Sequence, residues 1–462
     1  MPANIVTIKR MDYNKPDFNG AVSAQIGAGM NYEEAREYLD QVSKGGSVLG
    51  LDNMRELLKR LGNPQDSLKF VHISGTNGKG SVLAYLSTVF KEAGYRTGRY
   101  ISPTLFSYRE KIQVNEKFIG REDLSRLTEK VKAAAEEMQN CAAGDPTIFE
   151  IETALAFLYF VEQKCDIVIL ETGLGGALDA TNVITTPVME VIASISMDHM
   201  EFLGDTLGKI AYQKAGIIKP DTSVVSAMQQ PEAMEVICNV CRERDCTFQA
   251  VDPEQIKDIS YGYEGQSFSY KNWENIKISL MGSYQIKNAV LALEAINALR
   301  KLGYDLKDRA VYQGMKKAIW KGRFTLISKD PVILMDGAHN PAAAEELVRS
   351  LKLYYAGKKF YYIFGMFRDK DYAQVIRLTA PMAEHIITVQ TPGNPRALPA
   401  AELKEAVAEV NPSVEAAESL HMAVNQVMER IDSDSVVVIF GSLSFLGEAE
   451  MAVNRYKMEV ND

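Results

Sequence analysis

The chain has 462 residues, of which 46% are apolar and 24% charged, and its formal net charge is −9. A length above roughly 250–300 residues excludes a single core, and the balanced composition excludes a disordered or fibrous chain. The acidic charge gives no basic footprint for nucleic acid or an anionic membrane, and five cysteines argue against a disulfide framework. Residues 1–30 lack an apolar core of signal-peptide length, and no run approaches 18 apolar residues. We therefore expect a cytoplasmic protein with neither membrane nor nucleic-acid partners.

Short β-branched runs alternate with helical patterns from residue 69 onward, which predicts βαβ units and a mainly parallel sheet. The first strand, 70–73, precedes a glycine-rich loop at 75–81 and a run with apolar residues at helical spacing. Next come a helix at 149–163, a strand at 166–171, an apolar strand-like run at 188–196, a helix from Leu207 and a helix at 232–246. The polar and aromatic stretch 248–279 is interpreted as β structure, and helices follow at 284–302 and 307–319.

The turn at 320–323 is interpreted as a linker, because the alternation restarts after it. Strands are predicted at 332–335, 360–364, 385–389 and 436–440, with helical patterns between them, as in a smaller doubly wound unit. We therefore expect an α/β fold of two domains. The predicted divisions are an extension at 1–30, a P-loop nucleotide-binding domain with a mainly parallel sheet at 31–319, the linker, and a smaller C-terminal doubly wound domain at 324–462.

The loop after the first strand carries the clearest chemical signal. It consists of Gly75, Thr76, Asn77, Gly78, Lys79, Gly80 and Ser81. Glycines let backbone N–H groups approach phosphate oxygens, the helix N-terminus attracts anions, and the lysine can reach the β- and γ-phosphates. The loop is shorter than the usual pattern, and Gly80 separates the lysine from the serine. The alternative is a structural glycine turn, but the strand–loop–helix context favours a phosphate site.

Two later segments bring further polar groups to the same sheet edge. Glu171 ends a predicted strand just before a glycine-rich loop, where open α/β sheets place ligand-handling residues. It can hold Mg²⁺, although an acid at this position is equally compatible with a solvated surface. Asp198 and His199 follow the next strand-like run. Lys214 lies on the predicted helix from Leu207, where a lysine is normally solvated unless a metal lies nearby.

Other chemically suggestive residues have simpler interpretations. His72 lies within a predicted strand and is expected to be packed. Cys238, Cys241 and Cys246 resemble part of a zinc site, but the stretch supplies no obvious fourth ligand, so packing is the preferred interpretation.

From about residue 31 to the C-terminus, the chain resembles the folylpolyglutamate synthase and dihydrofolate synthase family of the Mur-ligase superfamily. The matching segments are 49–54, 75–81, 171–182, Asp198-His199, 214–217, Asn288-Ala289, Gly322-Arg323, 336–341 and 369–371. There are departures. Ala177 stands where the family has arginine, Gln213 where it has glutamate, and Tyr284-Gln285 where it has His-Gln. None of these removes a proposed metal or phosphate group.

Carried over position by position, the resemblance implies roles for the matching residues. The loop would bind ATP, with Lys79 on phosphate and Ser81 on Mg²⁺, while Glu171 and His199 would complete the shells of two Mg²⁺ ions. Lys214 matches a lysine that the family converts with CO₂ to a carbamate, an anionic ligand for the second Mg²⁺. Lys79, His199 and Lys214 are the expected catalytic residues. The remaining nucleotide contacts would be Asn288, Arg323, Asp336 and His339.

The resemblance implies an ATP-dependent ligase that joins L-glutamate to the carboxylate of folate or dihydropteroate through an acyl phosphate. We expect a monomer that uses ATP, two Mg²⁺ ions and a carbamylated lysine. Two alternatives remain open: a peptidoglycan-precursor ligase of the same superfamily, and a non-catalytic ATP-sensing switch. The segments 49–54 and 171–182 favour folate, and the nucleotide motif of the second domain counts against the switch.

Overall fold

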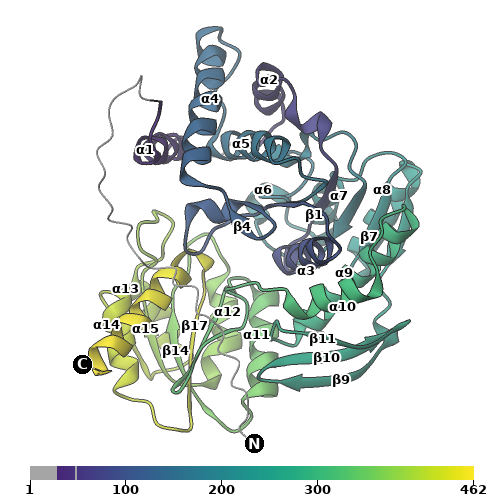
Figure 1. Ribbon diagram of the computed structural model, residues 1–462. Coiled ribbons are helices and arrows are strands. Elements are labelled where there is room, and N and C mark those ends of the chain that lie inside the picture. Colours follow the sequence, from purple (N-terminus) through teal and green to yellow (C-terminus); the bar gives the residue numbers. More distant parts are fainter. Residues whose placement is uncertain (1–28, 47–48, 462) are drawn as a thin grey trace, which may run out of the picture.

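The computed structural model describes residues 29–46 and 49–461, and these residues form three β-sheets (Figure 1). The predicted extension at 1–30 lies outside the described residues except for its last two. Within the described part of the chain, no helix is both long and apolar enough to cross a membrane.

The largest sheet has the order β4-β3-β2-β5-β1-β6-β7-β8. The strands from β2 to β8 along this order are parallel, and β3 and β4 add an antiparallel edge. The bounds are β1 Phe70–Ser74, β2 Thr97–Tyr100, β3 Ile112–Val114, β4 Lys117–Phe118, β5 Ile167–Glu171, β6 Met189–Ile192, β7 Ser223–Ser226 and β8 Thr247–Ala250. Because Ile73 pairs with Glu171 and Ser74 with Ile192, the carboxyl ends of β5, β1 and β6 meet at one edge.

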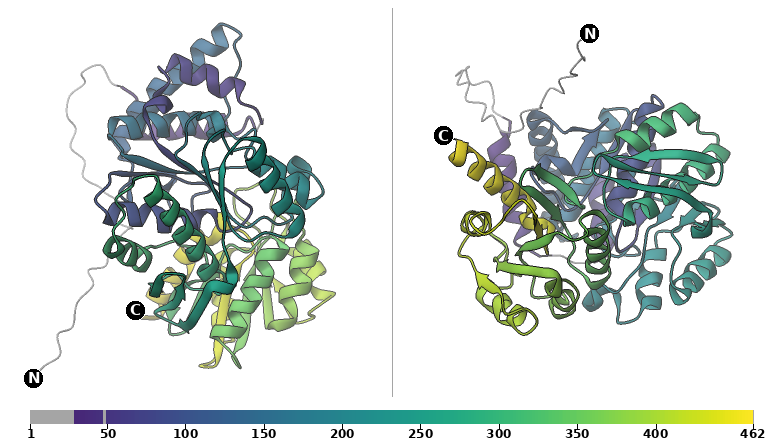
Figure 2. Two further views of the ribbon diagram at one scale, coloured as in Figure 1. Left: turned by 90° about the vertical axis from the view of Figure 1, so that its right-hand side faces the viewer. Right: turned by 90° about the horizontal axis from the view of Figure 1, so that it is seen from below.

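Helices cover both faces of this sheet, as Figure 2 shows from two further sides. One face packs against α3 (Lys79–Glu92), α9 (Tyr284–Lys301) and α10 (Asp308–Lys317). The opposite face packs against α1 (Tyr32–Ser43), α2 (Asp52–Arg60), α4 (Arg121–Asn140) and α5 (Ile148–Glu162), with α7 (Leu207–Ala215) and α8 (Pro231–Glu243) farther along. The short α6 (Met200–Leu203) precedes α7. Buried side chains occur all around α5, because the helix lies between β-strands and the outer helices.

A three-stranded antiparallel sheet, β11-β10-β9, packs on α9 and α10. Its strands are β9 (Ile256–Gly262), β10 (Gly265–Tyr270) and β11 (Trp273–Ile278). Every second residue of β10 is buried, the period that one covered sheet face requires. The β interpretation of 248–279 is confirmed.

The third sheet has the order β12-β13-β17-β14-β15-β16, with only β12 antiparallel. Its bounds are β12 Thr325–Lys329, β13 Val332–Asp336, β14 Lys359–Phe364, β15 Ala383–Thr388, β16 Val414–Ala416 and β17 Ser435–Phe440. One face is covered by α11 (Pro341–Tyr354), α12 (Tyr372–Thr379) and α13 (Ala400–Ala408), and the other by α14 (Leu420–Met428) and α15 (Leu446–Asn461). Short 3₁₀ turns occur at Pro64–Ser67, Tyr108–Lys111, Ala180–Val183, Pro253–Gln255, Ala380–Met382 and Leu443–Phe445.

The predicted α/β class, with a mainly parallel first sheet and a second doubly wound unit, is confirmed; the residue numbers of the domain division stay predictions. Two boundaries were wrong. The strand within 188–196 ends at Ile192, because the Ser194 carbonyl turns to accept hydrogen bonds from the glycine-rich loop. The helix predicted to 246 ends at Glu243, since Asp245 adopts a left-handed φ of 53° and Cys246 leads into β8.

Candidate active site

The glycine-rich loop joins β1 to α3 at the centre of the largest sheet. Gly75 and Gly78 have φ angles of 145° and 90°, which side chains disfavour. A Cβ atom at Gly75 would lie 2.7 Å from that of Ala193, and one at Gly78 would lie 2.4 Å from Oδ1 of Asn288. The first turn of α3 has no side-chain cap, so its N–H groups are available to an anion.

The residues after β6 hold this loop in place. The backbone N–H groups of Thr76 and Asn77 donate to the Ser194 carbonyl at 2.8 and 3.2 Å. The Thr76 hydroxyl also donates to the Ser196 carbonyl at 3.1 Å. These bonds fix the loop against the carboxyl end of β6, close to Asp198 and His199.

Lys79 and Glu171 lie together beside the loop. The Lys79 ammonium donates to the Gly75 carbonyl at 3.1 Å and lies 3.9 Å from Oε1 of Glu171. The Glu171 side chain is buried, and its Oε2 has no hydrogen-bond partner within residues 29–46 and 49–461. Burial raises the pKa of Glu171 to about 7, although the charges of Lys79 and Arg323 act in the opposite direction. A buried carboxylate oxygen without a partner is a suitable ligand for a cation.

Ser81 and Lys214 lie buried near the same loop. Ser81 is on the first turn of α3, two residues after Lys79. Lys214 reaches in from α7, and its amine donates to the Gly75 carbonyl at 2.8 Å. Burial, followed by the charge of Lys79, lowers the pKa of Lys214 to about 7. A large fraction of this amine is therefore neutral near pH 7, the form that reacts with CO₂.

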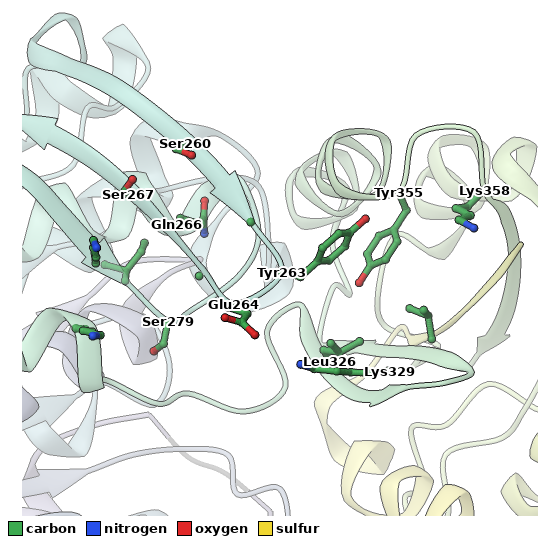
Figure 3. Close-up of a pocket in the computed structure, with 16 residues that line it drawn as sticks. Ser260, Tyr263, Glu264, Gln266, Ser267, Ser279, Leu326, Lys329, Tyr355 and Lys358 are labelled. Atoms are coloured by element: carbon green, nitrogen blue, oxygen red, sulfur yellow. The ribbon is translucent and has the colours of Figure 1, made fainter. Parts of the chain in front are cut away.

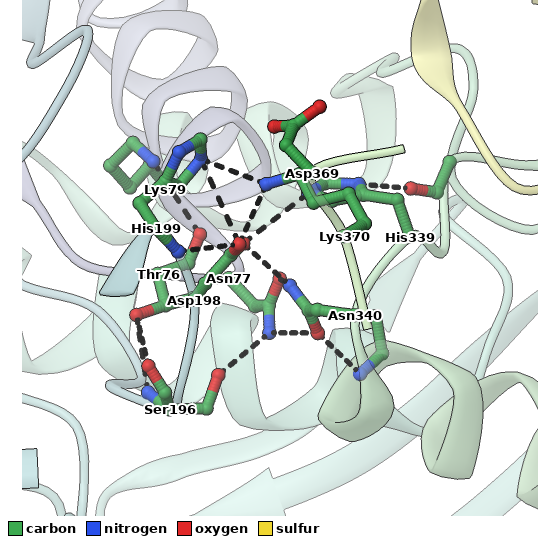
Figure 4. Close-up of polar contacts among 12 residues, drawn as sticks. Thr76, Asn77, Lys79, Ser196, Asp198, His199, His339, Asn340, Asp369 and Lys370 are labelled. Carbon is green, nitrogen blue, oxygen red and sulfur yellow. Dashed lines mark hydrogen bonds and ion pairs between the residues drawn. The ribbon is translucent and has the colours of Figure 1, made fainter. Parts of the chain in front are cut away.

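A second cluster of polar side chains joins the largest sheet to the C-terminal sheet (Figure 4). The Lys370 ammonium lies 2.6 Å from Oδ1 of Asp198 and 3.1 Å from Nε2 of His199. The Asn340 amide donates to Oδ2 of Asp198 at 3.0 Å, and Nε2 of His339 lies 3.4 Å from the same oxygen. The C-terminal sheet thus contributes a lysine, an asparagine and a histidine to groups that follow β6.

The electrostatics of this cluster depend on its burial. Burial alone would raise the pKa of Asp198, but the hydrogen bond with His339 and the charge of Lys370 hold it well below its usual range. Burial lowers the pKa of His199 to about 4, against the attraction of Asp198 and with the help of Lys370. Asp198 is therefore ionised and His199 neutral at physiological pH.

The predicted nucleotide contacts Asn288, Arg323 and Asp336 come from α9, from the turn before β12 and from the end of β13. Asn288 adjoins Gly78, and its amide donates to Oε1 of Gln285 at 3.1 Å. Asp336 is buried, and burial raises its pKa while the Arg323 charge lowers it. The Tyr284 hydroxyl donates to Asp336 at 2.8 Å, so the departure from histidine here supplies a donor to a buried carboxylate.

The departures at Ala177 and Gln213 meet in space. The Ala177 N–H donates to the Gln213 carbonyl at 2.8 Å. A Cβ atom at Gly216 would lie 2.4 Å from that of Ala177. The chain after β5 therefore packs closely on the end of α7, which positions Lys214.

The residues fit a cation only in part. Within residues 29–46 and 49–461, no three His, Cys, Asp or Glu side chains are grouped as a metal site. The predicted ligand set also includes a serine and a modified lysine. The Lys370 ammonium lies nearer to Nε2 of His199, at 3.1 Å, than the Asp198 carboxylate does, at 3.8 Å. The roles of Ser81, Glu171, His199 and Lys214 in metal binding stay predictions.

Lys370 and Asn340 have no role predicted from the sequence, although both lie in segments that match the family. Asn340 caps α11 by accepting from the Ala343 N–H at 2.9 Å, and its amide also faces Asn77 at 3.3 Å. The motifs identify the segments that contain these residues, but they do not show that the second domain brings the side chains to Asp198. The buried His72 was predicted correctly: it is packed and lies 2.8 Å from the Thr181 hydroxyl.

Known proteins resemble this chain over most of its length. Residues 73–296 match the Mur ligase middle domain, and residues 322–443 match the Mur ligase glutamate ligase domain. A dihydrofolate synthase/folylpolyglutamate synthase from Bacillus subtilis is 37% identical, over 90% of this chain and 98% of that protein.

Solved structures agree with this. The Mycobacterium tuberculosis folylpolyglutamate synthase complexed with ADP has a TM-score of 0.84 and 30% identity, over 91% of this chain and 97% of that one. Escherichia coli FolC in complex with DHPP and ADP has a TM-score of 0.80 and 27% identity, over 92% and 98%. The chain therefore belongs to the folylpolyglutamate synthase/dihydrofolate synthase family of Mur ligases.

Proposed function

We propose that this chain joins L-glutamate to the carboxylate of a folate or of dihydropteroate, with ATP as the source of free energy and an acyl phosphate as the intermediate. The chain has dihydrofolate synthase/folylpolyglutamate synthase activity by membership of its family. The observation that carries the mechanism is the convergence of the phosphate loop with side chains from the second domain. Asn77 of the loop contacts Asn340, and Asp198 beside it contacts Lys370.

A carboxylate is a poor electrophile, so its oxygen first takes the γ-phosphoryl group and ADP leaves. The glutamate amine then attacks the acyl carbon, loses a proton and expels phosphate. The chain's main task is positioning and charge neutralisation. Lys79 and the open N-terminus of α3 face the phosphates, and the second domain closes over them to exclude water.

Mg²⁺ would supply positive charge to the transferring phosphoryl group. Ser81 and Glu171 would hold one ion, and His199 with a carbamylated Lys214 a second. The unpartnered oxygen of Glu171 and the lowered pKa of Lys214 support this assignment. Unmodified, the Lys214 ammonium would repel the metal.

The test is a ligation assay with ATP, L-glutamate, Mg²⁺ and either tetrahydrofolate or dihydropteroate. We expect ADP and a product heavier by one glutamyl residue with at least one acceptor. ADP release without ligation would instead support an ATP-sensing switch. Ligation only to a nucleotide-linked peptidoglycan precursor would support the other Mur-type activity.

Two further expectations belong with this proposal. The chain acts in the cytoplasm, and it acts as a monomer, because both halves of the site come from one chain. Sedimentation equilibrium of the active protein tests the second, and an activity that appears only with a dimer would contradict it.

A further inference from the structure

A cavity lies away from the phosphate loop, between the three-stranded sheet and the C-terminal domain (Figure 3). Its volume is about 920 Å³, within the range of small-molecule sites. The turn between β9 and β10 forms one wall, and β12, β13 and the end of α11 form the other. None of the residues assigned to the ligase site lines this cavity.

Two tyrosines meet where the walls join. The rings of Tyr263 and Tyr355 lie 5.4 Å apart between centroids, at an angle of 50°. The Tyr263 hydroxyl donates to the Tyr354 carbonyl at 2.6 Å. These contacts join the three-stranded sheet to the C-terminal domain at the edge of the cavity.

The lining is basic although the whole chain is acidic. Its charged residues are Lys277, Lys316, Lys329, Lys358 and Glu264. Lys358 pairs with Asp434 at 2.8 Å, whereas the other three lysines make no ion pair with any residue that the structure describes. Lys277 and Lys316 belong to the middle domain, and Lys329 to the C-terminal domain. Lys277, Lys316 and Lys329 are all exposed, so water and salt screen their mutual repulsion, and an anion between them would be attracted to all three.

Two buried polar atoms in the lining also lack partners. Tyr355 is 4% exposed, and its hydroxyl oxygen, which lies buried just beneath the cavity surface, has no hydrogen-bond partner among the residues that the structure describes. Gln266 is 3% exposed; its amide nitrogen donates to the carbonyls of Leu280 and Gly282, while its Oε1 has no partner in the described part of the chain. A buried hydroxyl without a partner has a free-energy cost, which a ligand oxygen would remove once a shift of the side chain brings the hydroxyl to the cavity surface.

Short connections lead from this cavity to the nucleotide contacts. Gln266 holds the carbonyls just before α9, the helix that carries Asn288. On the other wall, Tyr355 adjoins Tyr354, whose ring lies 5.4 Å from that of Phe324, the residue after Arg323. A ligand in the cavity would therefore contact segments from both domains on either side of the predicted linker.

We propose that this cavity binds a small polyanion carrying two or more phosphate or carboxylate groups, and that the bound anion links the middle and C-terminal domains. Lys277 and Lys316 contact it from one domain, Lys329 contacts it from the other, and the Tyr355 hydroxyl donates to one of its oxygens. Its effect on nucleotide binding rests on the proposed function, whereas binding itself does not.

Calorimetry on the full chain tests the site, with ADP at saturation so that the nucleotide site is filled. The probes are inorganic tripolyphosphate and tetra-L-glutamate, which separate phosphate from carboxylate ligands. We expect one saturable site, with affinity lowered by about tenfold or more in K277Q/K329Q because two charged contacts are lost. The matched control K301Q/K404Q also removes one exposed lysine from each domain and should bind within twofold of the wild type.

Tyr355→Phe adds a readout that general electrostatics would not change: binding should weaken severalfold with no fall in the melting temperature. ADP affinity should rise at least twofold with the better probe present. The proposal is overturned if neither probe binds saturably, if K277Q/K329Q binds like the control, or if ADP affinity does not respond. None of these measurements requires ligation, so their failure is distinct from failure of the ligase assay.

Discussion

Replacing Glu171 with glutamine should make the free protein more stable and the enzyme much less active. The carboxylate is buried at the end of β5, and one of its oxygens has no hydrogen-bond partner in the part of the chain that the structure describes. Its pKa is about 7, compared with 4.5 for an ordinary glutamate. The charges of Lys79 and Arg323 offset only part of the free-energy cost of burial.

This pKa sets the size and the pH dependence of the effect. Between pH 4.5 and 7 the folded chain binds more protons at Glu171 than the unfolded chain, so stability falls as pH rises through that window. The difference corresponds to about 3 kcal/mol when complete. Glutamine resembles the neutral acid, so Glu171→Gln should raise the free energy of unfolding by roughly 1–3 kcal/mol at pH 8 and by less than about 1 kcal/mol at pH 5.

Urea unfolding at both pH values, with a chelator and without nucleotide, measures this gain. Glu405→Gln is the control, because Glu405 is exposed and forms no ion pair with any residue that the structure describes; its effect should stay within about 0.5 kcal/mol. Ligation by Glu171→Gln should fall about 10²- to 10³-fold, as when one preorganised electrostatic contact is lost. A variant that is no more stable at pH 8 than the wild type, or that retains full activity, would refute the reasoning.

Three further changes test the remaining groups. Lys79→Ala should abolish ATP-dependent product formation in a chain with unchanged circular dichroism, and near-normal turnover would remove its phosphate role. Lys214→Ala should lower the ligation rate about 10²- to 10³-fold, and short carboxylic acids should restore part of the activity. The control Lys209→Ala, on the exposed side of α7, should not lower the rate. A wild-type rate that does not respond to bicarbonate depletion, with no carbamate in a ¹³C spectrum, would exclude the modification. Lys370→Gln should destabilise the chain by about 3 kcal/mol, because the buried Asp198 carboxylate loses its ammonium partner and keeps only the Asn340 amide and His339. Adding Asp198→Asn should restore more than half of this loss, and a double variant no more stable than the single one would show that the pair is not coupled.

Much of the fold was predictable because its signals are local. The strands β1, β5 and β17 are buried at every position, so they occur as nearly continuous apolar segments. The antiparallel edge β3–β4 was not predicted, since strands of three and two residues carry too little periodicity. The order of the strands in each sheet could not be predicted either, because it depends on which strands each crossover connection places side by side.

In the candidate site, too, some residues could be identified from local sequence and others could not. Gly75 and Gly78 were identifiable because a loop that approaches phosphate needs glycine, and the packing against Ala193 and Asn288 gives a second reason. Lys370 was not identifiable as a site residue, because its contact with Asp198 joins residues 172 positions apart. Sequence reasoning finds groups whose chemistry is encoded within a few residues, and it misses those that two domains bring together.

The contact between Lys370 and His199 constrains the predicted role of His199 as a Mg²⁺ ligand. Neutral His199 accepts a hydrogen bond at Nε2 from the Lys370 ammonium at 3.1 Å, so the lone pair that would ligate a cation is occupied. The ammonium also pairs with Asp198, and a divalent ion at His199 would lie beside this positive charge. Lys370 must therefore move away before His199 can bind Mg²⁺. Because Lys370 belongs to the C-terminal domain, Mg²⁺ binding at His199 would require a different position of that lysine or of its domain. The Lys79 ammonium, 3.9 Å from Oε1 of Glu171, likewise lies beside the other predicted ligand, but it belongs to the same domain as Glu171.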